Sequence, residues 1–151
     1  MFLVTVCTPE SFYCIVEING APVGYLGIEN TEEDLWQLAA ELDEQYTNQG
    51  FGSRSVRLFL NEVSRITGRT LFRAKIYPDN IRSQKCVEKN GGQLVGLCVG
   101  GYLRLPEEQA RFEEENLYLI DDNIQELAER LGVEPRKLLS HVLDYRLECP
   151  V

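Results

Sequence analysis

The sequence predicts a mixed α/β fold of the α+β type. Segments with strand-like alternation occur before residue 44 and again after residue 70, and amphipathic helical segments lie between and after them. The chain has 151 residues, of which 44% are apolar and 26% are charged, so it is long enough to bury a core and has an ordinary composition for a soluble protein. We expect one domain over residues 1–105 and a helical C-terminal extension over residues 106–151.

The first forty residues are expected to form strands. Residues 2–6 are consistent with a first strand, and residues 12–18 and 22–28 alternate as a strand pair. Asn19-Gly20 between the two runs is a hairpin signal, because both residues tolerate positive φ. A further strand is predicted over residues 36–43.

A glycine turn then leads into the most clearly periodic helix of the chain. Gly50 and Gly52 lie within residues 45–53, and the helix that follows has apolar residues at Val56, Phe59, Leu60, Val63 and Ile66 and ends at Gly68. Glycines at a helix start leave backbone N–H groups accessible, and the helix dipole adds positive potential there. The turn is therefore a candidate phosphate site, although a glycine pair alone is also common in purely structural turns.

A second strand and helix follow at once. Residues 71–76 predict a strand that Pro78 ends. Asn80 is expected to accept a hydrogen bond from the Ser83 amide and to start a helix that closes near residues 90–92.

This order of elements resembles the GNAT superfamily of N-acetyltransferases. Residues 43–52 are similar to the family's acetyl-CoA loop, and Asn80-Ile81-Arg82-Ser83, continuing through Glu88-Lys89-Asn90-Gly91-Gly92, is similar to its next motif. The resemblance covers residues 12–105 and implies a mixed, mostly antiparallel central sheet flanked by helices. It also implies an acetyl-CoA-dependent N-acetyltransferase whose co-substrate is held by Leu42, Thr47, Asn48, Gln49, Gly50, Phe51, Gly52, Ser53, Asn80 and Ser83.

Three departures from the family pattern bear on function. Thr47 stands where most members have Gln or Arg, which weakens one side-chain contact to the diphosphate. Val87 stands where many members have a tyrosine that protonates the leaving thiolate. The two helices that members place after the first strand, as one wall of the acceptor site, are absent, so the site is either open or covered by another segment.

Charge is unevenly distributed along the chain. The net charge is −9 over residues 1–51, +6 over residues 52–90 and −6 over residues 91–151. The basic block suits the phosphates of coenzyme A, and Arg54, Arg82 and Lys85 are candidates to reach them, although each is equally consistent with a solvated helix residue. The acidic remainder argues against nucleic acid and favours a cationic acceptor, which would be a small-molecule amine or a protein amine.

Amine acetylation needs a neutral amine, because a lysine or polyamine nitrogen with a pKa of ~10.4 is almost fully protonated at neutral pH. A base therefore helps. On the strand over residues 36–43, Gln37, Ala39, Glu41 and Asp43 share the polar face. Glu41 is the first candidate for the base and Asp43 the second, and both are also consistent with strand-edge carboxylates in water. In the resembled family, backbone N–H groups of this strand polarise the thioester carbonyl.

Other chemistries find little support. The five cysteines have no metal-ligand spacing and the only histidine is His141, so we expect no disulfide framework, metal site or catalytic triad. Residues 1–7 are apolar but short, and they include no basic n-region because Arg54 is the first positive side chain. We therefore expect no signal peptide, no membrane span and a cytoplasmic location.

The C-terminal third is expected to begin with a β-hairpin and to continue as helices. Residues 94–99 and 102–105 are expected to pair across Gly100-Gly101, and the apolar spacing predicts helices over 124–131 and 138–147. These apolar stripes and the shortened amino-terminal part predict a homodimer. Two alternatives to an enzyme stay open: a non-catalytic acyl-CoA-binding or interaction module on the same fold, and a helical adaptor that acts through its tail.

Overall fold

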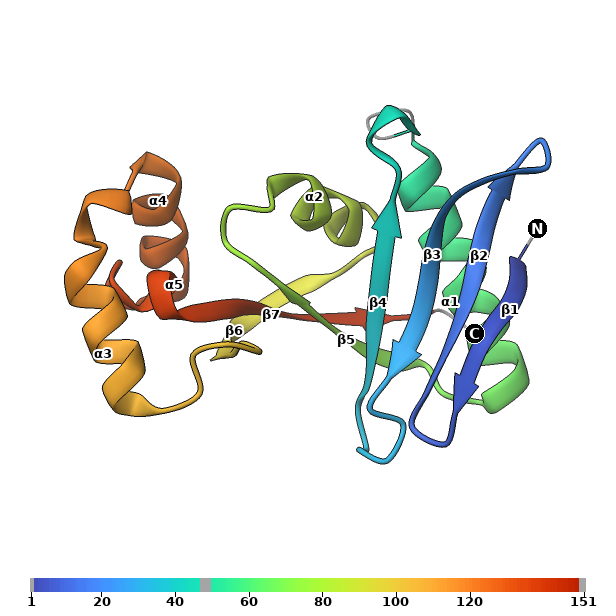
Figure 1. Ribbon diagram of the computed structural model, residues 1–151, viewed down its shortest axis with the longest axis horizontal. Helices are drawn as coiled ribbons and strands as arrows, with labels where there is room; N and C mark the ends of the chain where they lie inside the picture. Colours follow the sequence, from blue (N-terminus) through green and yellow to red (C-terminus); the bar gives the residue numbers. More distant parts are fainter. Residues whose placement is uncertain (1, 47–49, 150–151) are drawn as a thin grey trace.

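The computed structural model describes residues 2–46 and 50–149. Its strands form a seven-stranded sheet in the order β1-β2-β3-β4-β5-β7-β6 (Figure 1). Neighbouring strands are antiparallel throughout, except that β4 and β5 run parallel. The predicted mixed, mostly antiparallel sheet with flanking and C-terminal helices is confirmed.

The first four strands follow one another with short connections. They are β1 (Phe2–Thr8), β2 (Ser11–Ile18), β3 (Ala21–Glu29) and β4 (Trp36–Leu42). Asn19 and Gly20 between β2 and β3 have φ values of 52° and 80°, so the predicted tight hairpin is confirmed. Only Pro9 and Glu10 separate β1 from β2, and the two helices of the family pattern have no counterpart there.

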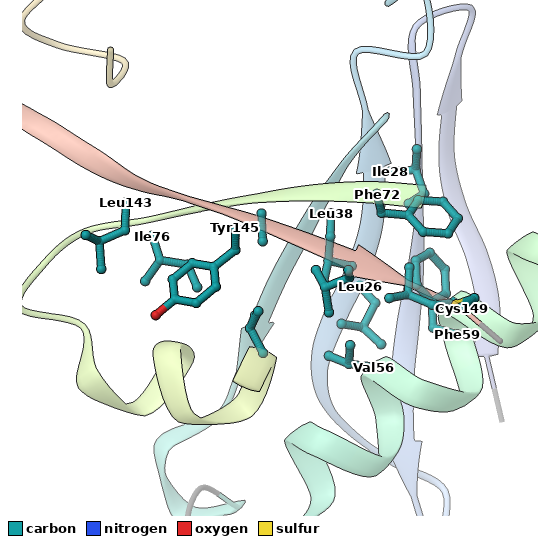
Figure 2. Packing of buried hydrophobic residues seen from close by; sticks show 14 of the residues in the cluster. Leu26, Ile28, Leu38, Val56, Phe59, Phe72, Ile76, Leu143, Tyr145 and Cys149 are labelled. Carbon is teal, nitrogen blue, oxygen red and sulfur yellow. The ribbon is translucent and has the colours of Figure 1, made fainter. Parts of the chain in front are cut away.

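Helix α1 (Phe51–Thr67) covers one face of the sheet. Its apolar stripe buries Val56, Phe59, Leu60 and Val63 against residues of β2, β3, β4 and β5 (Figure 2). The helix ends at Gly68 with φ 76°, the left-handed conformation expected of a C-terminal glycine. Among the described residues, no helix is long and apolar enough to cross a membrane.

The second strand and helix form as predicted. Strand β5 (Leu71–Ile76) leads to α2 (Ile81–Lys89), and the side chain of Asn80 accepts a hydrogen bond from the Ser83 N–H at 3.1 Å. This bond satisfies one of the first N–H groups of α2 and fixes where the helix begins.

The helix predicted over residues 138–147 is wrong. A short helix, α5 (Lys137–Ser140), ends before β7 (His141–Glu148), and β7 pairs with β5 on one side and with β6 (Gln93–Val99) on the other. A central strand is buried on both faces, so its apolar residues need not alternate, and a continuous apolar run is indistinguishable from a buried helix by spacing. The prediction of a hairpin between residues 94–99 and 102–105 is also wrong, because β7 is the strand that pairs with β6.

Three further helical segments gather at one end of the molecule, whereas the single turn η1 (Glu44–Tyr46) follows β4 (Figure 1). They are α3 (Pro106–Glu115), the single turn η2 (Leu117–Leu119) and α4 (Asp122–Leu131), which confirms the helix expected over 124–131. The division of the chain after residue 105 stays a prediction, and residues 141–148 contribute their strand to the main sheet.

A buried carboxylate fastens α3 to α5. Glu113 is 1% exposed and accepts hydrogen bonds from Ser140 Oγ at 2.5 Å and Arg136 Nε at 2.9 Å, and Lys137 Nζ lies 3.5 Å away. Burial alone would raise the pKa of Glu113, but these donors and the Lys137 charge outweigh it and hold the pKa below its ordinary value. The carboxylate is therefore ionised and fully partnered at neutral pH.

Candidate active site

The candidate site lies where two parallel strands separate. Strands β4 and β5 pair only at Trp36 with Phe72 and at Gln37 with Arg73, after which β5 leads away toward α2 (Figure 1). The edge of β4 over residues 38–42 thus has no partner in β5. A cleft of about 310 Å³ opens beside it, lined by the end of β4, parts of β2 and β3, the start of α1, and α2.

The start of α1 supplies backbone donors to this cleft. Gly50 precedes the helix with φ 80°, a conformation that residues other than glycine rarely adopt, and Gly52, Ser53 and Ser55 line the cleft with it. The first intrahelical bond runs from the Arg54 N–H to the Gly50 carbonyl at 3.1 Å, so the N–H groups before Arg54 have no partner within the helix. Together with the dipole of a 17-residue helix, they make a fitting environment for a diphosphate.

Helix α2 supplies positive charge to the same cleft. Arg82, Lys85 and Lys89 follow one another at i, i+3 and i+7, line the cleft and are exposed. Within the described parts of the chain none of the three forms an ion pair. Unpaired cations on one helix face beside the start of α1 suit a polyanion such as coenzyme A.

The two helices are tied together at the cleft. The side chain amide of Asn90, at the end of α2, donates to the Ser53 carbonyl at 3.1 Å and to Ser53 Oγ at 3.2 Å. It also donates to the Cys86 carbonyl at 3.0 Å. Asn90 thereby fixes the position of α2 relative to the glycine turn, and so the spacing between the cations and the backbone donors.

The opposite wall of the cleft is acidic and aromatic. Glu41 on β4 and Tyr25 on β3 both line it, and they are direct neighbours in the antiparallel β3–β4 register. Asp43 is outside the lining. Its carboxylate accepts hydrogen bonds from the Gln45 N–H at 3.1 Å and Gln45 Nε2 at 3.3 Å, so it caps the turn after β4.

The structure brings many of the predicted site residues together. Besides Asp43, two described residues of the prediction do not line the cleft: Phe51, whose ring packs edge-on against Tyr46 with centroids 6.3 Å apart, and Arg54. Residues 47–49, which include three predicted co-substrate contacts (Thr47, Asn48 and Gln49), lie outside the described residues. The predicted residues that line the cleft are Glu41, Leu42, Gly50, Gly52, Ser53, Asn80, Arg82, Ser83 and Lys85.

Sequence reasoning missed Tyr25, Cys86 and Lys89. The helical spacing from Arg82 to Lys89 was a usable signal for the third cation, whereas the position of Tyr25 depends on strand register. Burial raises the pKa of the Cys86 thiol, so the thiol stays protonated at neutral pH and is a poor nucleophile.

The Val87 side chain is apolar, so position 87 offers no proton donor to the cleft. Its side chain is 5% exposed and belongs to the hydrophobic core. The chain folds back tightly against it, because a Cβ added at Gly92 would lie 2.3 Å from Val87 Cγ1 and 2.7 Å from its carbonyl oxygen. Glycine at position 92 is therefore a packing requirement.

Comparison with known proteins identifies the family. The family model described as the acetyltransferase (GNAT) domain matches residues 5–93, which is more than half of the chain. The chain belongs to the GNAT acetyltransferase family. A search of curated protein sequences finds no match.

Solved GNAT structures share the fold at low sequence identity. One is the ribosomal-protein-S5-alanine acetyltransferase from Vibrio fischeri (14% identity, TM-score 0.60), of which 62% is covered by 92% of this chain. Another is an aminoglycoside acetyltransferase in complex with coenzyme A (14% identity, TM-score 0.58), of which 66% is covered by 92% of this chain. A third is a spermidine N-acetyltransferase variant from Vibrio cholerae (10% identity, TM-score 0.62), of which 66% is covered by 93% of this chain. This GNAT chain therefore spans less than two thirds of the length of each.

Proposed function

We propose that this GNAT protein is an acetyl-CoA-dependent N-acetyltransferase that acts on a cationic amine. The observation that carries the proposal is the polarity of the cleft. Backbone donors and three cations that have no ion-pair partner among the described residues line it, and so does Glu41, on the part of β4 that does not pair with β5.

The basic side suits the phosphates of the co-substrate. The N–H groups at the start of α1 would receive the diphosphate, and Arg82, Lys85 and Lys89 would balance its charge. The unpaired edge of β4 offers backbone N–H groups that can polarise a thioester carbonyl. The coenzyme A complex of the aminoglycoside acetyltransferase supports this assignment by fold.

The acidic side suits the acceptor. Glu41 takes a proton from the ammonium group, directly or through water, and so supplies the neutral amine. The amine nitrogen then forms a bond to the acetyl carbon as the carbon–sulfur bond breaks. The sulfur keeps the electron pair of the broken bond and takes up the second proton that the nitrogen loses, so coenzyme A is released as a free thiol. Overall, one ammonium and one acetyl-CoA give one amide, one thiol and one proton.

Thiol release on an amine panel tests this proposal. The panel takes its chemistry from the solved neighbours: spermidine, kanamycin, and peptides that begin with a free alanine or serine. Coenzyme A release is followed with a thiol-reactive chromophore, and acetyl-CoA binding by calorimetry.

Glu41→Gln separates the base from the co-substrate site. The substitution keeps the side-chain length and removes the basicity, so turnover should fall roughly 100-fold while acetyl-CoA affinity persists. The loss should shrink as pH rises toward the pKa of the acceptor, because free amine then becomes abundant. Glu32→Gln, at an exposed loop position, is the matched control. A Glu41→Gln rate close to wild type at pH 7 would contradict the role of the base.

A second candidate function is a non-catalytic acyl-CoA-binding module. The burial of Val87 favours it, because no side chain at that position can protonate a leaving thiolate. Acetyl-CoA binding without thiol release on any amine of the panel would support this second function over the first.

A further inference from the structure

Tyr25 is an immediate neighbour of Glu41 in the cleft and has no role in the reaction described above. Tyr25 faces Glu41 directly across the β3–β4 ladder, lines the cleft and is 38% exposed. Directly opposed residues in antiparallel strands have Cβ atoms about 4.5–5.5 Å apart, so their polar ends can meet. A phenol has one O–H to donate, whereas an ionised carboxylate only accepts.

The pKa of the Tyr25 phenol is raised above its ordinary value. Burial raises the pKa of the Tyr25 phenol, and a hydrogen bond to the Glu41 carboxylate together with the negative charges of Glu41 and Glu29 raises it further. The phenol is therefore a neutral donor across the physiological range. When it donates to one oxygen of Glu41, the other oxygen stays free for an ammonium group.

The Tyr25 ring is held from the other side. The ring of Tyr13 meets it edge-on, with centroids 5.8 Å apart and an interplanar angle of 80°. Tyr13 lies over Gly27, where an added Cβ would come within 2.3 Å of Tyr13 Cδ1, and its hydroxyl donates a hydrogen bond to Glu29. A glycine under the ring and a carboxylate at its hydroxyl thus hold Tyr13, and Tyr13 in turn restricts Tyr25.

We propose that Tyr25 is a positioning residue for the acceptor side of the cleft, where its hydroxyl holds one oxygen of Glu41 and directs the other toward the amine. The inference rests on the proposed function, because it assigns Tyr25 a role through Glu41. It does not replace the missing donor at Val87, since Tyr25 belongs to β3 and its proposed partner is Glu41 rather than the leaving thiolate.

A first experiment tests the contact without requiring turnover. The seven tyrosines are labelled with ¹³C at the ring Cζ, Tyr25→Phe assigns the Tyr25 signal, and the signal is followed as pH rises. Glu41→Gln should lower the Tyr25 pKa toward its ordinary value of 10.0, whereas Glu32→Gln should leave it unchanged. A Tyr25 titration that Glu41→Gln does not move would overturn the inference.

A second experiment tests the role of the contact. Tyr25→Phe keeps the ring and its packing on Tyr13 but removes the hydroxyl, so kcat should fall about tenfold while the KM for acetyl-CoA stays unchanged. The double variant Tyr25→Phe/Glu41→Gln should be no slower than Glu41→Gln alone. Tyr118→Phe, at a residue 80% exposed on η2, is the control.

The outcomes separate this inference from the function on which it rests. A wild-type protein that releases no thiol with any amine of the panel contradicts the proposed function. An active wild-type protein with an equally active Tyr25→Phe variant contradicts the positioning role alone, as would additive losses in the double variant.

Discussion

Replacement of Gly52 by aspartate is expected to weaken coenzyme A binding at least tenfold without unfolding the protein. Gly52 is the second residue of α1 and lines the cleft. An added Cβ would have Leu42 Cδ2 at 3.7 Å and Cys86 Sγ at 3.9 Å as its nearest neighbours, which are ordinary contacts, so a side chain fits at this position. The new carboxylate would share the cleft with a diphosphate. At about 5 Å, two unit charges repel by ~0.8 kcal/mol in a dielectric of ~80 and by ~3.3 kcal/mol in one of ~20, and tenfold in affinity corresponds to ~1.4 kcal/mol.

Stability should change in the opposite direction from affinity. A carboxylate in the first turn of a helix interacts favourably with the helix dipole by about 0.3–1 kcal/mol, so the free Gly52→Asp protein should melt no lower than wild type. Gly52→Asn has the same shape without the charge, and the affinity difference between the two variants, measured by calorimetry, isolates the electrostatic repulsion. This difference should shrink as salt is added. Equal affinities for the Asp and Asn variants would refute the placement of the phosphates at the start of α1.

Three further predictions concern stability and assembly. Glu113→Gln should lower the free energy of unfolding by about 2 kcal/mol relative to Glu114→Gln, because it removes the charge that three donors share. Since the pKa of Glu113 is held below 4.5 in the folded state, its contribution is present above that pH and is lost as pH falls, so the variant should lose part of the wild-type acid sensitivity in denaturant titrations. Gly92→Ala should cost about 1–3 kcal/mol because its Cβ meets Val87, whereas Gly96→Ala, with no atom within 4 Å, should be tolerated in the same urea experiment. We also expect light scattering at tens of micromolar protein to give about twice the 17.2 kDa of the chain, and a monomer mass would contradict the predicted homodimer.

The elements that depend on local signals were predictable from the sequence. The positive φ values at Asn19 and Gly20 and the cap at Asn80 all lie where residue type alone indicates them. The co-substrate side of the cleft was also predictable, because a glycine turn and a helix start each depend on consecutive residues. The structure brings Gly50, Gly52, Asn80 and Ser83 to one cleft as the motif spacing suggested.

The features that depend on distant partners were not predictable. The run His141–Glu148 forms a strand because β5 and β6 lie on either side of it, and nothing within the run reports those neighbours. Tyr25 reaches Glu41 only through the register of β3 and β4, which the loop between them does not encode in any pattern we could recognise. The alternation of side chains along a strand suggested that Asp43 shares the face of Glu41. However, Asp43 lies beyond the end of β4, where its carboxylate caps a turn.

The position of β7 has a consequence for how this chain acquires its structure during synthesis. Strands β5 and β6 are made first, yet they do not pair with each other, and both wait for residues 141–148. Until that segment leaves the ribosome, two apolar strands present unpaired backbone groups to other chains. The sheet is thus completed last at an inner position, and we expect the partly made chain to be more open to misassociation than the finished one.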